Sequence, residues 1–201
     1  MLVSGTKSRP RYCGLHPDPF AKHHLIAAEG EGAFVVEDLF ARAPDGFLAR
    51  ATILFAAGAC APADRATGLQ ALGAHATYLA PTVPTLLVRL NALLAGATMG
   101  TRLYAAGTEG FIGQVMQVAL GHGMDHQSIS TEHRGSLARR IQCVHCKGIT
   151  EDVTTQVVTC AHCGVALQVR DHYSRRLAAF MAVSIDAEAP GEVPPAQEVY
   201  R

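Results

Sequence analysis

Two Cys-x-x-Cys pairs near the carboxyl end constrain the fold of this chain more than any other feature. The pairs contain Cys143 with Cys146 and Cys160 with Cys163, four of the six cysteines in 201 residues. A Cys-x-x-Cys turn brings two sulfurs to one ion, and four thiolates suit the tetrahedral coordination of zinc. We therefore predict a metal site whose ligands are these four cysteines.

The residues around the pairs predict a zinc ribbon. Thirteen residues separate the pairs, and the β-forming run Ile149–Thr159 allows one strand out and one strand back. We expect Gly148 and Gly164 to relieve the backbone where it bends toward the metal. Four thiolates leave no open coordination position, so the predicted metal is structural and not catalytic. His145 and His162 lie inside the Cys-x-x-Cys loops; either could replace a cysteine, but the simpler reading leaves both outside the ligand set.

Two other uses of the same four cysteines stay open. Iron fits a tetrahedral sulfur site as well as zinc by ligand type, and would make the chain a rubredoxin-like electron carrier. Zinc ribbons also bind nucleic acids. Against that use, the basic excess between residues 132 and 178 is small, and no aromatic residues are interleaved for base stacking.

Strands and helices alternate between residues 51 and 130. Strands are expected at 51–57, 75–80, 102–106 and 128–130, the first of them buried on both faces, with helices at 64–72, 84–95 and 108–123. Such alternation predicts an α/β domain, a parallel sheet flanked by helices, with ligand loops after the strands. Those loops are Gly58–Pro62, Pro81–Pro84 and Gly107–Gly110.

The predicted organisation has four parts. They are an N-terminal extension (1–45), the α/β domain (46–134), the zinc ribbon with its following segment (135–186) and a flexible, proline-containing tail (187–201). Within the extension, Ala33–Glu37 is expected to be a strand. After the second cysteine pair, the segment 170–183 is expected to form a strand end and a helix.

The remaining candidate residues have plain structural interpretations. His16, His23 and His24 are predicted to be scattered surface histidines. His122, His126 and His133 with Asp125 could form an open metal site, but are better read as polar loop residues. Cys13 and Cys60 are interpreted as small buried or incidental residues. No serine-nucleophile, zinc-protease or P-loop motif is present.

Charge and hydrophobicity argue against a nucleic-acid-binding, membrane-spanning or secreted protein. Basic and acidic residues balance at 17 each, so no bulk attraction to nucleic acid or anionic membranes is expected. No apolar run reaches about 18 residues, the length that spans a membrane. The polar, proline-broken N-terminus lacks the apolar centre of a secretory signal. We expect a cytoplasmic protein.

Part of the α/β region resembles the nucleotide-binding domain of ferredoxin reductase-like enzymes. RLYAAGTEGFIGQVMQVALGHGMDHQSISTEHR is similar to the last strand, helix and strand of that domain, and ILFAAGACAPA to its first strand and glycine-rich turn. In that comparison Ala106 stands at the cysteine beside the nicotinamide, and Glu132 at the final glutamate. The turn keeps one glycine, Gly58, so the resemblance implies a degenerate domain with doubtful NAD binding.

Most of the chain from residue 45 onward resembles the small zinc-ribbon subunits of bacterial dimethylamine monooxygenases. The similarity is densest in RRIQCVHCKGITEDVTTQVVTCAHCGVALQVRDHYSRRLAAFMAV. It implies an accessory subunit of a haem-, NAD(P)H- and O2-dependent enzyme of methylamine metabolism, which converts dimethylamine to methylamine and formaldehyde. It also implies partners, a haem-containing oxygenase subunit and a flavin/iron–sulfur reductase subunit, so that haem, FMN and a 2Fe–2S cluster are expected in those partners and not in this chain.

One segment is a candidate partner surface. In RDHYSRR, Arg170, Arg175 and Arg176 could pair with carboxylates of another subunit, while His172 and Tyr173 fill a pocket. The alternative is that Asp171 caps a helix and the arginines are solvated.

Overall fold

The chain forms two compact units. The computed structural model describes residues 8–58 and 64–201. One unit, here the sheet unit, contains residues 12–135; the other, the cysteine unit, contains the N-terminal residues up to Arg11 together with 136–201. Each unit is described by itself below.

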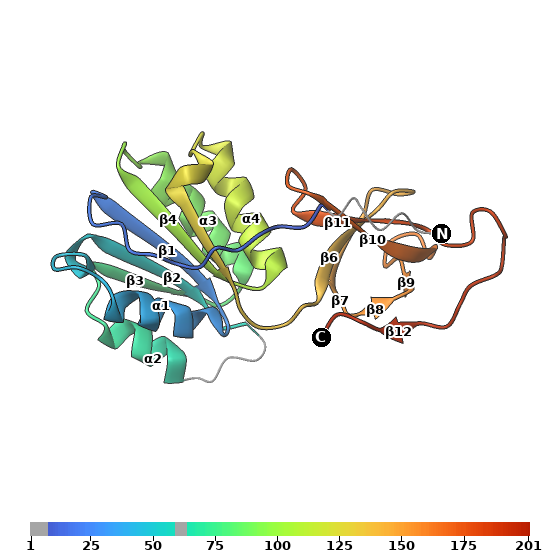
Figure 1. The fold of residues 1–201 in the computed structure, drawn as a ribbon, viewed down its shortest axis with the longest axis horizontal. Helices are drawn as coiled ribbons and strands as arrows, with labels where there is room; N and C mark the ends of the chain where they lie inside the picture. Colours follow the sequence, from blue (N-terminus) through green and yellow to red (C-terminus); the bar gives the residue numbers. More distant parts are fainter. Residues whose placement is uncertain (1–7, 59–63) are drawn as a thin grey trace. The chain divides into compact units, whose positions relative to one another are not determined.

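The sheet unit is built on five parallel strands in the order β3-β2-β1-β4-β5 (Figure 1). The strands are β1 (His23–Glu29), β2 (Ala51–Ala56), β3 (Ala76–Ala80), β4 (Thr101–Gly107) and β5 (Ile129–His133). The helices are α1 (Gly32–Ala41), α2 (Asp64–Ala71), α3 (Val83–Ala95) and α4 (Glu109–Gly121), with 3-10 turns at Leu48–Arg50 and His126–Ser128. The predicted parallel sheet flanked by helices is confirmed.

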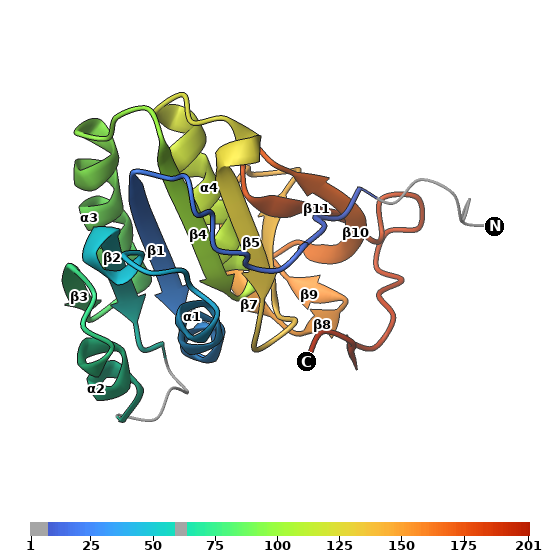
Figure 2. The same cartoon turned by 60° about the vertical axis from the view of Figure 1, so that its left-hand side comes forward.

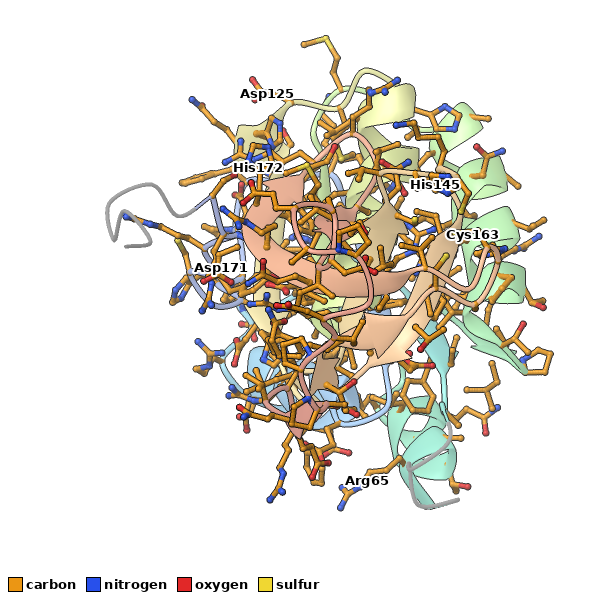
Figure 3. The ribbon with its side chains drawn as sticks, turned by 90° about the vertical axis from the view of Figure 1, so that its right-hand side faces the viewer. Arg65, Asp125, His145, Cys163, Asp171 and His172 are labelled. Carbon is orange, nitrogen blue, oxygen red and sulfur yellow. The ribbon has the colours of Figure 1, made fainter. Side chains whose placement is uncertain are left out.

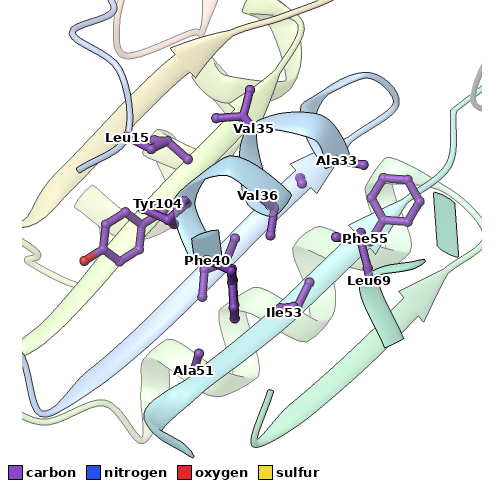
Figure 4. Packing of buried hydrophobic residues seen from close by; sticks show 14 of the residues in the cluster. Leu15, Ala33, Val35, Val36, Phe40, Ala51, Ile53, Phe55, Leu69 and Tyr104 are labelled. Atoms are coloured by element: carbon purple, nitrogen blue, oxygen red, sulfur yellow. The ribbon is translucent and has the colours of Figure 1, made fainter. Parts of the chain in front are cut away.

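Alternating residues of the central strands supply two apolar layers. Ile26 and Ala28 of β1 pack with α1 and α2, and Leu25 and Ala27 pack with α3 and α4 on the opposite face. Figure 2 shows α1 on one side of β1 and β4 and α3 on the other, and Figure 4 shows the layer beneath α1. Strands buried on both faces explain the nearly continuous apolar runs of β2 and β4.

The first strand of the sheet is β1, which the sequence analysis missed. The expected strand at Ala33–Glu37 is wrong, because those residues lie in α1, where Val35, Val36 and Leu39 all face the core. The comparison of ILFAAGACAPA with a first strand is also wrong. Its strand, β2, is second in the chain, and β1 is the strand that lies at the centre of the sheet.

The cysteine unit is entirely β in its described residues. Its sheet has the order β7-β6-β11-β10-β9, and β12 pairs with β8. The strands are β6 (Arg139–Cys143), β7 (Ile149–Val153), β8 (Thr155–Gln156), β9 (Val158–Thr159), β10 (Ala166–Ser174), β11 (Ala179–Ser184) and β12 (Gln197–Glu198).

Two features of the cysteine unit differ from expectation. The helix expected after residue 170 is wrong, because β10 and β11 form an antiparallel hairpin there. The terminal segment pairs with β8 through β12 in a separate two-stranded sheet, and Tyr200 is buried against the core. Among the described residues of both units, no helix is long and apolar enough to cross a membrane.

Candidate metal centre

The four predicted ligands lie together. All four sulfur atoms lie within 4.8 Å of one another; they belong to Cys143, Cys146, Cys160 and Cys163. The Cys143–Cys163 sulfurs are 3.9 Å apart and the Cys146–Cys160 sulfurs 3.7 Å. A tetrahedron with metal–sulfur bonds of about 2.3 Å has edges of about 3.8 Å, whereas a disulfide needs about 2.05 Å. The four sulfurs therefore have the spacing of a tetrahedral metal site, and they can bind a metal ion.

The two cysteine turns have the same backbone hydrogen bonds. In the first, Cys143 N–H donates to Gly148 and Lys147 N–H donates back to Cys143. In the second, Cys160 N–H donates to Val165 and Gly164 N–H donates back to Cys160. Two turns with the same hydrogen bonding thus bring their cysteine sulfurs to one cluster.

Equivalent positions in the two turns carry different residues. Lys147 (φ 64°) and Gly164 (φ 75°) both occupy the left-handed region. The expectation that Gly164 relieves the backbone fits this conformation, but for Gly148 it is wrong, since Lys147 takes that role in the first turn. Gly148 is needed for space, because a Cβ there would lie 2.6 Å from Cγ of His162.

The two histidines of the turns differ in their contacts. The His162 ring lies against Gly148, and its Nε2 is 2.6 Å from the carbonyl oxygen of Ile149. At the equivalent place beside the second turn, Val165 carries a side chain. His145 is exposed (Figure 3). His162 thus braces the first turn, and the clustered ligand set consists of the cysteines alone.

Burial divides the four thiols. Cys143 and Cys160 are 1% and 2% exposed, Cys163 is half-buried and Cys146 is exposed. Burial raises the pKa of Cys160, but N–H groups of His162 and Cys163 and the adjacent thiols outweigh it and lower that pKa to about 6. The backbone N–H of Val165 lowers the pKa of Cys163, yet burial and the neighbouring thiols raise it to about 12. The crowded sulfurs cannot all be thiolates without a cation, which suits a divalent metal.

A buried arginine joins the strands of the cysteine unit. The Arg139 guanidinium lies 4.1 Å from the ring centroids of both Phe180 and Tyr200. It donates to Asp171 at 2.8 Å, and Arg9 donates to both oxygens of the same carboxylate at 2.7 Å. Asp171 is therefore no helix cap. It lies in a bulge of β10, between Val169 and Tyr173.

The candidate partner surface includes this bulge, and its residues do not all face solvent. Arg170 and His172 are exposed on β10, and Arg175 and Arg176 are exposed in the following turn. Tyr173 instead packs edge-on against Phe180, with ring centroids 5.1 Å apart. Asp171 and His172 lie on neighbouring positions of the same strand (Figure 3).

The other predicted residues are not gathered into a site. His24 is wrongly predicted as a surface residue: it is fully buried, stacks on Phe47 and lies 3.2 Å from the Tyr104 hydroxyl. His122 pairs with Asn91, and Asp125 caps a 3-10 turn. Within the described chain, the four cysteines are the only group of clustered metal-binding side chains. Cys13 is exposed, and Cys60 lies outside the described residues.

The carboxyl edge of the parallel sheet carries a carboxylate that sequence reasoning missed. β1 and β4 are the strands where the chain reverses direction across the sheet, the usual ligand position in such folds. There Glu29 accepts from the hydroxyl of Thr108 at 2.7 Å, at the N-terminus of α4. A Cβ on Gly32 would lie 2.5 Å from the carbonyl carbon of Ala106, so this glycine permits close helix–strand packing. The Gly30-x-Gly32 spacing was the available sequence signal.

The other two predicted ligand loops have structural roles or are incompletely described. Thr82 caps the N-terminus of α3 and Pro84 lies in its first turn. Of Gly58–Pro62, only Gly58 is among the described residues, with φ 66°.

Comparison with protein families gives two matches that together span both units. Residues 4–129 match the N-terminal domain, and residues 140–183 the C-terminal domain, of "Dimethylamine monooxygenase subunit DmmA-like" proteins. The chain is also 32% identical over 187 residues to the heme-dependent oxidative N-demethylase delta subunit of Ectopseudomonas mendocina (strain ymp), with 91% of each chain covered.

Solved structures give weaker similarities. A type IV self-sufficient cytochrome P450 monooxygenase aligns with a TM-score of 0.42 at 19% identity, over 63% of this chain and 17% of that one. The flavohem-like FAD/NAD-binding domain of nitric oxide dioxygenase from Vibrio cholerae O1 biovar El Tor aligns at 0.37 and 17% identity, over 57% of this chain and 52% of that one. The chain thus spans only part of each of these proteins.

Proposed function

The chain belongs to the family of DmmA-like dimethylamine monooxygenase subunits, and from this premise we propose that it is a non-catalytic subunit of a multi-subunit haem-dependent oxidative N-demethylase. The complex would use NAD(P)H and O2 to convert dimethylamine to methylamine and formaldehyde. The haem-containing oxygenase subunit and the flavin/iron–sulfur reductase subunit would carry haem, FMN and the 2Fe–2S cluster. This chain would assemble with them in the cytoplasm, where thiols stay reduced.

The observation that carries the proposal for this chain itself is the tetrahedral spacing of the four sulfurs. Four sulfurs within 4.8 Å of one another, with two pairs at 3.7 and 3.9 Å, fit zinc and leave no position for substrate. Bound zinc would hold the two cysteine turns together and supply part of the folding free energy of the unit, on the order of 10 kcal/mol. The chain's own residues hold the ion and brace the turns; they perform no step of the demethylation.

The sheet unit is proposed to serve assembly and not hydride transfer. In dinucleotide-binding folds, backbone N–H groups at the carboxyl edge of the sheet face a pyrophosphate. Here the carboxylate of Glu29 already accepts hydrogen bonds from Thr108 at the start of α4, and it would repel a phosphate. The Gly58 turn follows β2 and not β1, so the case against NAD(P)H binding rests on the charge of Glu29 at the end of β1.

The exposed basic residues of the cysteine unit are the proposed partner contact. Arg170, Arg175 and Arg176 present positive charge from one strand and its turn. A carboxylate-bearing surface of a partner subunit would complement them. Charge reversal at Arg170 and Arg175 should weaken co-purification with the other subunits, whereas reversal at Arg89 on α3 should not.

A second function follows from the exposure of Cys146. Iron fits the same sulfur spacing, and an exposed ligand shortens the path by which an electron would enter or leave. Elemental analysis and a visible spectrum of the purified full chain test both functions. One zinc per chain and no colour supports the structural centre, while one iron with thiolate charge-transfer bands would replace it with an electron carrier.

A further inference from the structure

The four-cysteine cluster is unevenly shielded from solvent. The protein covers Cys143 and Cys160 almost completely, whereas Cys146 is exposed between two exposed neighbours, His145 and Lys147. Cys146 also has little hydrogen-bond protection, with one backbone donor, Gly148, at 3.4 Å. A metal-bound thiolate remains a nucleophile, and oxidants attack cysteines according to thiolate character and exposure. Cys146 is therefore the ligand that a small oxidant reaches first.

Cys146 has a close thiol neighbour in the other cysteine turn. Its sulfur lies 3.7 Å from that of Cys160. The second close contact, 3.9 Å between Cys143 and Cys163, also joins the two turns. An oxidised Cys146 thus has Cys160 in position as a resolving thiolate.

We propose that the cluster is a site of oxidative modification, in which a peroxide oxidises Cys146 and Cys160 then closes a disulfide with it. The inference rests on the zinc centre proposed above. The Cys146 thiolate attacks one peroxide oxygen, the O–O bond breaks, and the products are a sulfenic acid and hydroxide. The Cys160 thiolate then attacks the Cys146 sulfur and displaces a second hydroxide. Two thiolates lose two electrons in total, and the peroxide gains them.

Disulfide formation would prevent the cysteine unit from binding its zinc. It removes two of four ligands, so zinc leaves the remaining pair, Cys143 and Cys163. A thiol reductant would regenerate all four ligands and permit reloading. The cysteine unit would thereby lose and regain its metal according to the peroxide level around the complex.

The position of Lys147 allows a direct experiment on the full chain. Trypsin cleaves after Arg140, Lys147 and Arg170, so the two turns fall into separate peptides, 141–147 and 148–170. After zinc content is measured, the chain is treated with substoichiometric hydrogen peroxide, zinc release is followed with a chromogenic chelator, and free thiols are alkylated before digestion. We expect one disulfide per zinc released, joining the two peptides, with fragmentation placing it at Cys146 and Cys160.

Two matched variants separate the roles of the cysteines. Cys146→His keeps a Cys3His ligand set, which also binds zinc, and should slow peroxide-driven zinc release by about tenfold or more. Cys163→His keeps both reacting thiols and should release zinc as fast as the unmodified chain. Cys13→Ser, outside the cluster, should change nothing.

Three results would overturn the inference: a disulfide confined to peptide 141–147, a Cys143–Cys163 bond formed first, or unchanged zinc release from Cys146→His. A chain that contains no zinc before oxidation contradicts the proposed zinc centre instead. The peptide map then still decides whether Cys146 and Cys160 are the pair that oxidises.

Discussion

Gly148 shows how one missing side chain makes the two cysteine turns unequal. One of its Cα hydrogens lies where a methyl group would meet the His162 ring, whose Nε2 is hydrogen-bonded to the carbonyl oxygen of Ile149. From the sequence, both Gly148 and Gly164 were expected to relieve the backbone where it bends toward the metal, but of the two only Gly164 has a positive φ. Spacing within a motif could predict the ligands, but the contact between Gly148 and His162 depends on how two turns face each other, which no local pattern reports.

Gly148→Ala should destabilise the metal-loaded cysteine unit by about 1–3 kcal/mol, because the new methyl group overlaps a ring whose Nε2 is held by the carbonyl oxygen of Ile149. Urea unfolding of the loaded chain measures the loss. His162→Ala in the same background should restore part of it by removing the ring. If the double variant is no more stable than Gly148→Ala alone, the overlap with His162 is not the cause.

His24 predicts how the sheet unit responds to acid. Burial, with a smaller contribution from the nearby positive charge of Arg50, lowers the pKa of His24 to about 4; Asp18 acts in the opposite direction. The folded state therefore favours the neutral ring, and the unfolded chain, with a pKa near 6.5, takes up the proton first. Stability from this group is complete above about pH 6.5 and is lost as pH falls toward 4, by about 2 kcal/mol at pH 5.

Urea-dependent hydrogen exchange of β1 and β4 at pH 7 and pH 5 measures this loss without interference from the metal site. His24→Leu should abolish most of the difference between the two pH values. His23→Leu, the same change at the exposed neighbouring position, should leave it intact. An equal pH dependence in the His24 variant would assign the acid sensitivity to another group.

At the scale of elements, the alternation between residues 51 and 130 was predictable, because strands buried on both faces are continuous apolar runs, whereas the helices repeat apolar residues every three to four positions. β1 escaped notice because His23 and His24 open it, and buried histidines are uncommon. Val35 and Val36 suggested a strand, yet packing against the sheet made them helical. The β10–β11 hairpin contains Arg, Leu and Ala, which favour helices, but pairing with β6 and β9 outweighs that preference.

The bulge of β10 should be a stabilising element through Asp171. Burial alone would raise the pKa of the Asp171 carboxyl. Arg9 and Arg139 together have the larger effect and hold that pKa below its ordinary value. Asp171→Asn removes the charge opposite Arg139, whose side chain is 6% exposed, and should cost about 2 kcal/mol in urea unfolding. The matched change Glu151→Gln, at the half-exposed partner of Arg140, should cost under about 1 kcal/mol. Equal losses would show that the buried network adds nothing beyond a surface ion pair.

At the scale of the whole molecule, each unit has its own apolar core, and the metal belongs to only one of them. The core of the cysteine unit is the smaller, and it includes two of the ligands, Cys143 and Cys160. Metal removal should therefore act on that unit selectively, because the sheet unit keeps both of its apolar layers.

A strong chelator at neutral pH should abolish amide protection in β6, β7 and β10 while β1, β2 and β4 stay protected. Hydrogen exchange with mass spectrometry resolves these strands in one experiment. Re-addition of zinc should restore protection in the cysteine unit, and the chelator should have no effect on a chain already lacking metal through Cys143→Ser and Cys160→Ser. Simultaneous loss of protection in both units would mean that they fold as one cooperative body, and retention in both would mean that the metal contributes nothing to the fold.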